Sequence, residues 1–264
     1  MIADRAYLKG ARIGAGLGRL EAEVTRILTV LGSTGAIRVE PAALQPADVA
    51  LDLYGEDIRA RAFVTSDDGA ELMLRPDFTL PLVRLHLEAG ATPARYAYCG
   101  PVWRRQEFGS DRPREYLQAG FEIFEAGDPA ATDAEVLGLV VEAPFVPVVG
   151  GPERGEAAGE AAQLGQRVGG GAGDPEHRLD PRHRAGVEPG RLRFEASFGR
   201  TTLEYYDGLV FGALPRGRPD LPPIASGGRY DALTRALGHG RGIPAVGGML
   251  RPEALLALKG GAAC

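Results

Sequence analysis

The long segment from Gly150 to Gly190 sets the strongest limit on how this chain can fold. It contains no aromatic residue, no isoleucine and only two leucines. Such a segment cannot bury enough apolar surface to offset the entropy that is lost when a chain becomes ordered. We therefore expect residues 1–147 and 191–264 to form one folded core in two parts, with residues 148–190 as a disordered or weakly structured insert.

The composition of the whole chain is that of a globular protein. Of its 264 residues, 44% are apolar and 25% are charged, which is ordinary for a soluble domain. The net charge of -5 argues against non-specific binding to nucleic acid. No apolar run approaches the roughly 20 residues that a membrane span needs. We therefore expect neither nucleic acid nor membrane among the partners.

The cysteines and the N-terminus favour a cytoplasmic location. The two cysteines, Cys99 and Cys264, form no C-x-x-C pair, which leaves no zinc or thioredoxin motif and suits a reducing compartment. The first residues, MIADRAYLKG, lack the apolar core of a signal peptide.

Periodic patterns predict the class of fold. Apolar residues at spacings of three and four predict a helix from Leu17 to Leu31, which Gly32 ends. The polar turn at residues 66–69 predicts a hairpin between strands at 61–64 and 72–74. Further helices are predicted at 79–87, 132–142, 230–237 and 253–258, and further strands at 37–39, 95–99, 102–106, 115–124, 192–198, 209–211 and 245–250. Because hairpins join most strands, we expect an α+β fold with a mainly antiparallel sheet flanked by helices.

An arginine-rich hairpin is the clearest candidate for a binding site. In PVWRRQEFGSDRPREYLQAGFE (101–122), strand alternation places Arg104 and Gln106 on one face, and Gln118 and Glu122 on one face of the partner strand. Guanidinium groups bind phosphate or carboxylate through paired hydrogen bonds. The alternative is a solvated sheet face with cross-strand ion pairs.

The glycine-rich segments carry weaker signals. RIGAGLGR near the N-terminus lacks the G-x-G-x-x-G spacing, because Arg19 stands where the last glycine belongs. In SGGRYDALTRALG (226–238), two glycines before Arg229 would allow a tight turn and a close approach to a ligand; the alternative is a plain turn before a helix. The four histidines are scattered without metal-ligand spacing. We expect no metal and no cofactor.

Taken together, four segments resemble the catalytic core of histidyl-tRNA synthetases, which are class II aminoacyl-tRNA synthetases. The segments, in the order seen in that family, are LRPDFTLPLVR (74–84), GPVWRRQEFGSDRPREYLQAGFE (100–122), LEYYDGLVF (203–211) and GGRYDALTRALG followed by PAVG (227–238 and 244–247). The resemblance covers most of the chain outside residues 148–190. It implies an antiparallel sheet flanked by helices.

The resemblance also implies a pocket for histidine. The residues that match the family's histidine-contacting positions are Asp77, Thr79, Arg104, Gln118, Glu122, Tyr205, Tyr206 and Tyr230. Asp77 and Thr79 stand where the family holds the α-amino group, with aspartate in place of glutamate. Arg104 matches the arginine that holds a carboxylate or α-phosphate. Arg112 matches a loop arginine that reaches ATP, and is the candidate for further anion binding.

The chain departs from the family pattern where catalysis would take place. Thr201 replaces an arginine that the family uses in adenylation, and Ala254 replaces the ATP-binding arginine that follows Glu253. Gln106 replaces a glutamate. Losing one fixed cation at a reacting phosphate commonly costs about 3 kcal/mol of transition-state stabilisation. We therefore expect that this chain does not form an adenylate, and we assign no catalytic residue.

A synthetase-like core without catalytic arginines resembles the regulatory subunits of ATP phosphoribosyltransferase, the first enzyme of histidine biosynthesis. That resemblance implies a non-catalytic subunit which a short catalytic subunit needs for full activity, and which takes part in feedback inhibition by L-histidine. The histidine would bind in the vestigial pocket or at the subunit interface. A self-dimer within a hetero-oligomer is also implied. With eleven residues after Glu253, we expect no anticodon-binding domain.

Two other functions stay open. The first is a synthetase-like ligase that activates histidine or another amino acid with ATP for a non-tRNA acceptor. Thr201 and Ala254 oppose it, and the residues that favour it are Arg104, Arg112, Asp77 and Glu122. The second is a binding module without any link to histidine, such as a scaffold that joins partner chains.

Overall fold

The structure is a computed structural model, and the part of the chain that it describes is limited. The described residues are 13–48, 61–89, 94–110, 112–141, 146–150, 193–194, 205–215 and 217–260. The predicted insert at 148–190 lies outside them, except for residues 148–150, which end a strand. Most of the strand predicted at 192–198 also lies outside them.

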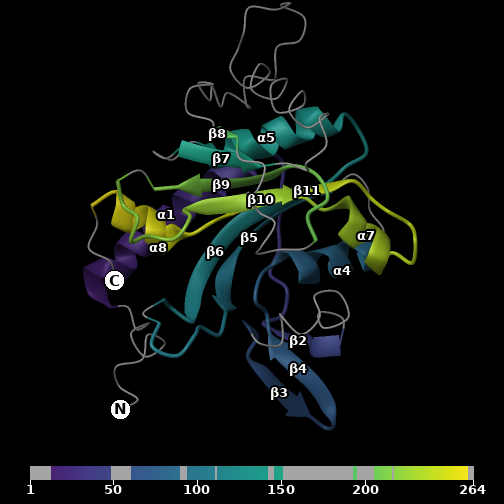
Figure 1. The fold of residues 1–264 in the computed structure, drawn as a ribbon, viewed down its shortest axis with the longest axis horizontal. Helices are drawn as coiled ribbons and strands as arrows, with labels where there is room; N and C mark the ends of the chain where they lie inside the picture. The colour runs from purple at the N-terminus through teal and green to yellow at the C-terminus, as the bar shows by residue number, and fades with distance from the viewer. Residues whose placement is uncertain are drawn as a thin grey trace, which may run out of the picture.

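A large sheet forms the centre of the described fold (Figure 1). Its strand order is β1-β5-β6-β11-β10-β9-β7-β8. In that order, the strands are Ile37–Arg38, Ala94–Trp103, Glu115–Phe124, Ala245–Leu250, Ala225–Arg229, Val210–Leu214, Val146–Gly150 and Arg193–Phe194. Only the two outermost pairs, β1 with β5 and β7 with β8, are parallel. The predicted α+β class with a mainly antiparallel sheet is confirmed.

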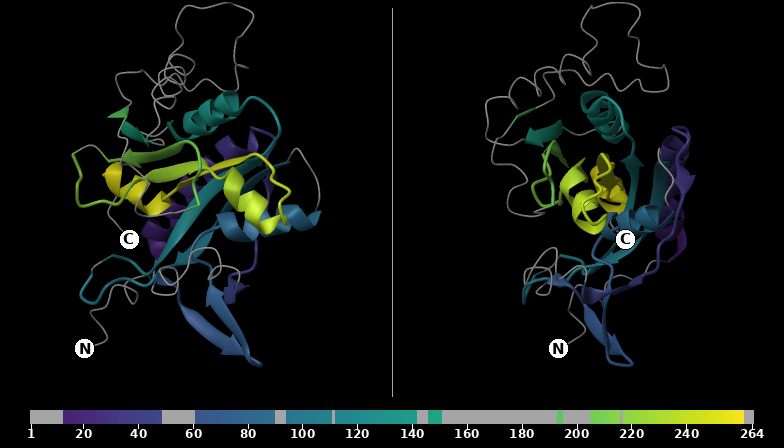
Figure 2. Two further views of the ribbon diagram at one scale, coloured as in Figure 1. Left: turned by 45° about the vertical axis from the view of Figure 1, so that its right-hand side comes forward. Right: turned by 90° about the vertical axis from the view of Figure 1, so that its right-hand side faces the viewer.

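Helices pack on both faces of this sheet. On one face, α1 (Gly14–Gly32), α5 (Pro129–Val141) and α8 (Pro252–Leu258) contribute to the largest apolar cluster. Figure 2 shows α1 and α8 side by side, and Lys259 Nζ lies 2.9 Å from Glu23 Oε1 between them. On the other face, α4 (Thr79–Ala89) and α7 (Asp231–Leu237) pack around a second cluster that is rich in aromatic side chains. This second face carries the pocket described below.

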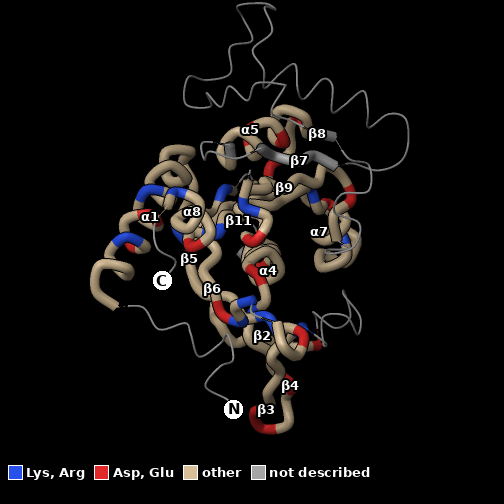
Figure 3. Tube along the Cα trace, turned by 60° about the vertical axis from the view of Figure 1, so that its left-hand side comes forward, with Lys and Arg blue, Asp and Glu red and all other residues tan. Residues whose placement is uncertain are grey.

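A small separate sheet projects from the main body (Figure 1). It consists of β2 (Leu44–Pro46), β3 (Val64–Asp67) and β4 (Ala70–Leu74), in the order β2-β4-β3. The predicted hairpin joins β3 to β4, and its two turn residues, Asp68 and Gly69, have φ of 45° and 84°. Positive φ at both positions is typical of the tight turns that match strand twist. Acidic residues mark this end of the molecule in Figure 3.

Arg75 ties this small sheet to the large one. Its side chain is buried, its Nε donates to the carbonyl of Pro101 at 3.0 Å, and its guanidinium lies 4.2 Å from the centre of the Phe78 ring. Because Arg75 follows β4 directly, the same contacts fix the path of the chain into α4. The segment between β4 and α4 is therefore held against the sheet, where it supplies part of the pocket wall.

Two predicted local structures were wrong. The strands predicted at 95–99 and 102–106 form the single strand β5, which ends at Trp103. Pro101 does not break it. The nitrogen and the carbonyl of one strand residue point the same way, and the Pro101 carbonyl points at Arg75. The N–H that proline lacks would therefore also face Arg75, so its absence costs the sheet no hydrogen bond. The glycines before Arg229, predicted as a turn, lie in strand β10 between β9 and β11.

None of the helices that the structure describes combines the length and the apolar character that crossing a lipid bilayer would need. Within the same residues, no three histidine, cysteine, aspartate or glutamate side chains gather closely enough to hold a metal ion.

Candidate functional site

A pocket lies on the face of the sheet that α4 and α7 cover. Its walls include all eight residues that the sequence predicts around histidine: Asp77, Thr79, Arg104, Gln118, Glu122, Tyr205, Tyr206 and Tyr230. Five further residues, which the sequence reasoning missed, complete the lining: Tyr98, Ser226, Gly247, Gly248 and Met249. Residues from distant parts of the sequence therefore converge on one site.

Strand alternation explains how β6 contributes to the pocket. Gln118 and Glu122 point to the pocket side, whereas Phe121 between them packs in the apolar cluster on the opposite face. Both polar side chains are only 1% exposed. The alternative interpretation of this face as a solvated surface is therefore wrong, because helices and neighbouring side chains cover it.

Glu122 occupies the centre of the pocket's hydrogen-bond network. Its carboxylate accepts from Thr79 Oγ1 at 2.9 Å, from the Tyr230 hydroxyl at 2.5 Å and from the Tyr98 hydroxyl at 3.5 Å. Burial raises the pKa of Glu122 to about 8, and the nearby charge of Asp77 adds to this effect, although the hydroxyl donors oppose it. Burial therefore favours the protonated form of this carboxyl group at neutral pH.

Asp77 and Arg104 form the charged end of the pocket. Burial raises the pKa of Asp77, whereas the positive charge of Arg104 and two backbone N–H groups lower it. Arg104 is held in place because its Nε donates to the carbonyl of Pro76 at 2.8 Å. Among the described residues its two terminal nitrogens have no hydrogen-bond partner, so they are available to an anionic group of a ligand.

Tyrosine side chains supply the remaining polar groups. The Tyr205 and Tyr206 rings lie 4.7 Å apart, and the Tyr205 ring meets the Tyr230 ring edge-on at 6.2 Å. Burial raises the pKa of Tyr98, Tyr206 and Tyr230, so these hydroxyls stay neutral. A neutral hydroxyl can either donate or accept a hydrogen bond.

Three glycines of the sheet, named here the glycine floor, lie against side chains that line the pocket, and one of them, Gly247, lines the pocket itself. A Cβ atom on Gly247 would lie 1.6 Å from Glu122 Oε2, one on Gly120 would lie 2.5 Å from the Tyr98 hydroxyl, and one on Gly228 would lie 2.9 Å from the Tyr206 ring. These glycines lie on the adjacent strands β6, β11 and β10. Because they carry no side chain, the pocket's polar groups lie directly on the backbone of the sheet.

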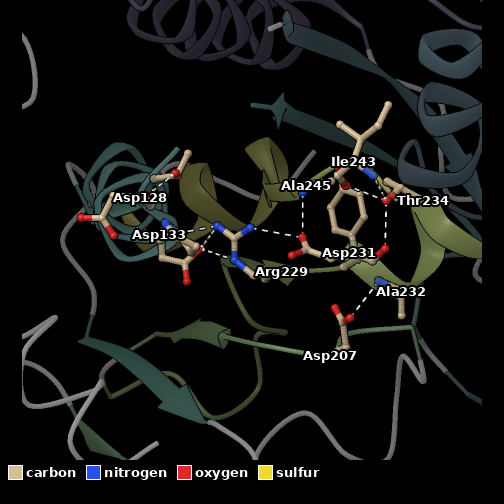
Figure 4. Close-up of polar contacts among 12 residues, drawn as sticks. Asp128, Asp133, Asp207, Arg229, Asp231, Ala232, Thr234, Ile243 and Ala245 are labelled. Carbon is tan, nitrogen blue, oxygen red and sulfur yellow. Dashed lines mark hydrogen bonds and ion pairs between the residues drawn. The ribbon is translucent and has the colours of Figure 1, made fainter. Parts of the chain in front are cut away.

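An ion-pair network fixes the position of Tyr230 (Figure 4). Arg229 Nη2 lies 2.6 Å from Asp133 Oδ1 on α5, and Arg229 Nη1 lies 3.2 Å from Asp231 Oδ1. Asp231 Oδ1 also accepts from the backbone N–H of Ala245 at 2.7 Å. The start of α7 is therefore held to α5 and to β11, with Tyr230 placed between these anchors.

The predicted anion-binding residue lies outside this pocket. Arg112 is exposed in the loop between β5 and β6, where its backbone N–H donates to Ser110 Oγ at 3.3 Å. It does not contribute to the pocket lining, and its anion binding stays a prediction.

Of the positions that depart from the synthetase pattern, the two that the structure describes, Ala254 and Gln106, do not line the pocket. Thr201 lies outside the described residues. Ala254 belongs to α8 and is buried among apolar side chains, and Glu253 accepts a hydrogen bond from the backbone N–H of Leu117 at 3.0 Å. Gln106 is half-buried and donates to the carbonyl of Pro113 at 3.3 Å.

Arg251 is a cation that the sequence reasoning did not assign to the site. It caps α8, donates to the carbonyl of Pro223, and lies 5.8 Å from the centre of the Tyr116 ring. Burial lowers its pKa, and the charge of Arg104 has the same effect. Its contacts to Pro223 and Tyr116 give it a structural role near the charged end of the pocket.

Comparison with known proteins identifies the family of this chain. The profile of the family described as histidyl-tRNA synthetase matches residues 16–149 and 191–255. A protein named ATP phosphoribosyltransferase regulatory subunit from Sinorhizobium medicae is 47% identical over 104 residues, which are 39% of this chain and 27% of that protein. A protein with the same name from Brucella ovis is 47% identical over 109 residues, which are 40% and 28% of the two chains. The matches thus span little more than a quarter of the length of these relatives.

Solved structures resemble the fold over nearly the whole chain. The structure titled as an ATP phosphoribosyltransferase regulatory subunit/histidyl-tRNA synthetase from Bacillus halodurans C has a TM-score of 0.70 at 19% identity, and covers 94% of this chain and 82% of that one. Apo histidyl-tRNA synthetase from S. aureus has a TM-score of 0.70 at 18% identity, with 94% and 68% covered. These likenesses show the class II synthetase fold. Because the family profile matches well over half of the chain, the protein belongs to the histidyl-tRNA synthetase family.

Proposed function

We propose that this protein is a non-catalytic regulatory subunit of ATP phosphoribosyltransferase, and that its pocket binds L-histidine as an effector. The observation that carries the proposal is the chemistry of the pocket, where two buried carboxyl groups, one arginine and several neutral hydroxyls surround one space. The name of the relatives that are 47% identical supports the regulatory role.

The charged groups of the pocket suit a zwitterion with a basic side chain. Arg104 presents two terminal nitrogens to a carboxylate, and Asp77 beside it can accept hydrogen bonds from an ammonium group. Glu122 and its hydroxyl neighbours remain for a further group that can donate hydrogen bonds. Histidine carries all three groups, which is why we favour it over an amino acid with an apolar side chain.

Two features support a role without adenylation chemistry. Ala254 carries no charge, and its methyl group is buried in the apolar cluster. Gln106 is half-buried, and its side chain donates a hydrogen bond to the backbone of its own loop. The pocket therefore provides groups that bind an amino acid, but positions that the family uses for ATP carry other residues.

In this proposal histidine acts by shifting the activity of a short catalytic subunit. Coupling between an effector and a partner's active conformation typically amounts to about 1 to 3 kcal/mol. The chain would act within a hetero-oligomer and pair with a second copy of itself. Binding of histidine at the interface with the catalytic subunit is the alternative location.

Reconstitution tests the proposal directly. The full chain is mixed with a short-form ATP phosphoribosyltransferase catalytic subunit, and formation of phosphoribosyl-ATP is followed with and without L-histidine. We expect activation by the chain and reversal by histidine. A chain that is folded by circular dichroism, but neither activates the catalytic subunit nor changes its response to histidine, would refute the regulatory role.

One observation favours a second function, a ligase that activates an amino acid with ATP. The terminal nitrogens of Arg104 could bind a phosphate as well as a carboxylate. Amino-acid-dependent exchange of pyrophosphate into ATP by the isolated chain would establish this activity. The absence of exchange, in a preparation that binds histidine, would rule it out.

A further inference from the structure

The residue that precedes helix α7 does not cap the helix with its own side chain. This residue, Tyr230, occupies the N-cap position but makes no capping hydrogen bond. Its hydroxyl instead points into the pocket, where it donates to Glu122 at 2.5 Å. Because the first backbone N–H groups of a helix have no partner within the helix, those of α7 need an acceptor from another part of the chain.

Asp207 supplies this acceptor from the segment before β9 (Figure 4). Its Oδ2 accepts a hydrogen bond from the backbone N–H of Ala232 at 2.8 Å, and the backbone N–H of Asp231 also donates to this carboxylate. Aspartate is among the residues that cap helices best. Here the capping residue lies 25 positions before Ala232 in the sequence, so the cap joins two separate segments of the chain.

The segment that contains Asp207 also contributes two tyrosines to the pocket. Tyr205 and Tyr206, which directly precede Asp207, both line it. The backbone N–H of Asp207 donates to the carbonyl of Arg229 at 3.1 Å. The side chain and the backbone of Asp207 therefore both hold this tyrosine segment to the start of α7.

The packing of three tyrosine rings depends on this junction. The centre of the Tyr205 ring lies 4.7 Å from that of Tyr206 and 6.2 Å from that of Tyr230. Tyr205 and Tyr206 belong to the segment on one side of the junction, and Tyr230 belongs to the segment on the other. Without the cap, the first two rings would be free to shift relative to Tyr230 and to the rest of the pocket wall.

We propose that Asp207 is a positioning residue, which holds Tyr205 and Tyr206 in the wall of the pocket by capping α7. Asp207 does not line the pocket itself, so it acts on a ligand only through its neighbours. The inference rests on the proposed function, because it takes L-histidine as the ligand. The alternative, a cap that only stabilises the helix, would leave the affinity for histidine unchanged.

The test compares the full chain with Asp207→Ala, Asp207→Asn and Asp128→Ala. Asparagine keeps a side-chain oxygen that can accept from the helix N–H groups, and it caps helices about as well as aspartate does. Asp128 is the matched control, because it is also exposed and its Oδ1 accepts from the backbone N–H of Ala130 in the first turn of α5 at 3.0 Å. Asp128 does not line the pocket.

The affinity of each protein for L-histidine is measured by calorimetry. Asp207→Ala should weaken binding about fivefold, which corresponds to the loss of one capping bond, because binding must then restore the order that the cap supplied. Asp207→Asn and Asp128→Ala should stay within about twofold of the wild type. Both alanine variants should lower the midpoint of urea unfolding by similar amounts, since each removes a helix cap.

A measurement without ligand keeps the inference testable if no histidine binds. Aromatic rings that are packed in fixed positions give a circular dichroism signal in the near ultraviolet, and this signal is lost when the packing becomes mobile. Asp207→Ala should reduce the tyrosine signal of the folded protein, whereas Asp207→Asn and Asp128→Ala should keep it.

The outcomes separate the inference from the function on which it rests. Unchanged affinity in Asp207→Ala overturns the inference and leaves histidine binding in place. An equal loss of affinity in Asp128→Ala or in Asp207→Asn also overturns it, because the effect would then come from general destabilisation or from charge. A folded wild-type chain that binds no histidine, alone or with its catalytic partner, overturns the proposed function, and the tyrosine signal then decides whether Asp207 positions the rings.

Discussion

Replacing Gly247 by alanine should displace the carboxyl group of Glu122 in the pocket. The added Cβ would lie 1.6 Å from Glu122 Oε2 and 2.9 Å from the carbonyl oxygen of Phe121. Real Cβ atoms do not approach other atoms so closely, and the backbone carbonyl is fixed by the sheet. The carboxyl group of Glu122 must therefore move away from its present position.

The expected cost follows from the contacts that Glu122 would lose. It accepts hydrogen bonds from Thr79 and Tyr230, and each such bond contributes about 1 kcal/mol to stability. Crowding of a packed interior adds about 1 to 3 kcal/mol. We expect Gly247→Ala to lower the free energy of unfolding by about 3 to 5 kcal/mol, as measured by denaturant titration.

Two controls isolate the cause of this loss. Gly18→Ala lies in α1 and its Cβ would meet no atom within 4 Å, so it should raise stability by about 0.5 to 1 kcal/mol. In a Glu122→Ala background most of the cost of Gly247→Ala should disappear, because the obstructing carboxyl group is gone. A cost below about 1 kcal/mol, or the same cost in both backgrounds, would refute the reasoning.

Three further predictions concern the same region. The pKa of Glu122 is raised to about 8 in the folded protein, from 4.5, so its contribution to stability is full below pH 4.5 and is lost as the pH rises. Between pH 5 and 8 the free energy of unfolding of the wild type should fall by about 1.4 kcal/mol per pH unit relative to Glu122→Gln. Parallel pH profiles of the two proteins in urea unfolding would contradict this. Arg229→Ala should cost about 3 kcal/mol because it removes the largely buried ion pair with Asp133, and thermal unfolding with an unchanged midpoint would count against it. Tyr206→Phe should weaken inhibition by histidine severalfold while leaving assembly intact, as checked by activity assays and size-exclusion chromatography; unchanged inhibition would remove this hydroxyl from the mechanism.

The amphipathic and alternating segments could be predicted from the sequence. The helix α1 follows from apolar spacing, because it buries one side, and the strand β6 follows from the alternation of polar and apolar residues, although the structure covers both of its faces. The eight pocket residues came from the resemblance to a family, since no local pattern brings Asp77 close to Tyr230. Their convergence depends on the order of strands in the sheet, which a single sequence does not specify.

The missed features share a physical cause. Gly227 and Gly228 suggested a turn, because glycine is common where the chain reverses. In the structure a Cβ on Gly227 would lie 2.2 Å from the carbonyl oxygen of Gly247 on the neighbouring strand. The glycines thus allow segments that are far apart in the sequence to come into close contact. The local sequence pattern does not reveal such contacts. Pro101 in β5 is a similar case, since its tolerance depends on Arg75 from another element.

The glycine floor has a consequence for how this site can change over evolutionary time. Gly120, Gly228 and Gly247 carry no side chain that a mutation could reshape, and any larger residue there would collide with Tyr98, Tyr206 or Glu122. New ligand preferences are therefore expected from changes in the side chains that line the pocket, such as Asp77, Ser226 and Met249. The glycine floor limits where variation can act, and these side chains are the part that natural variation can remodel.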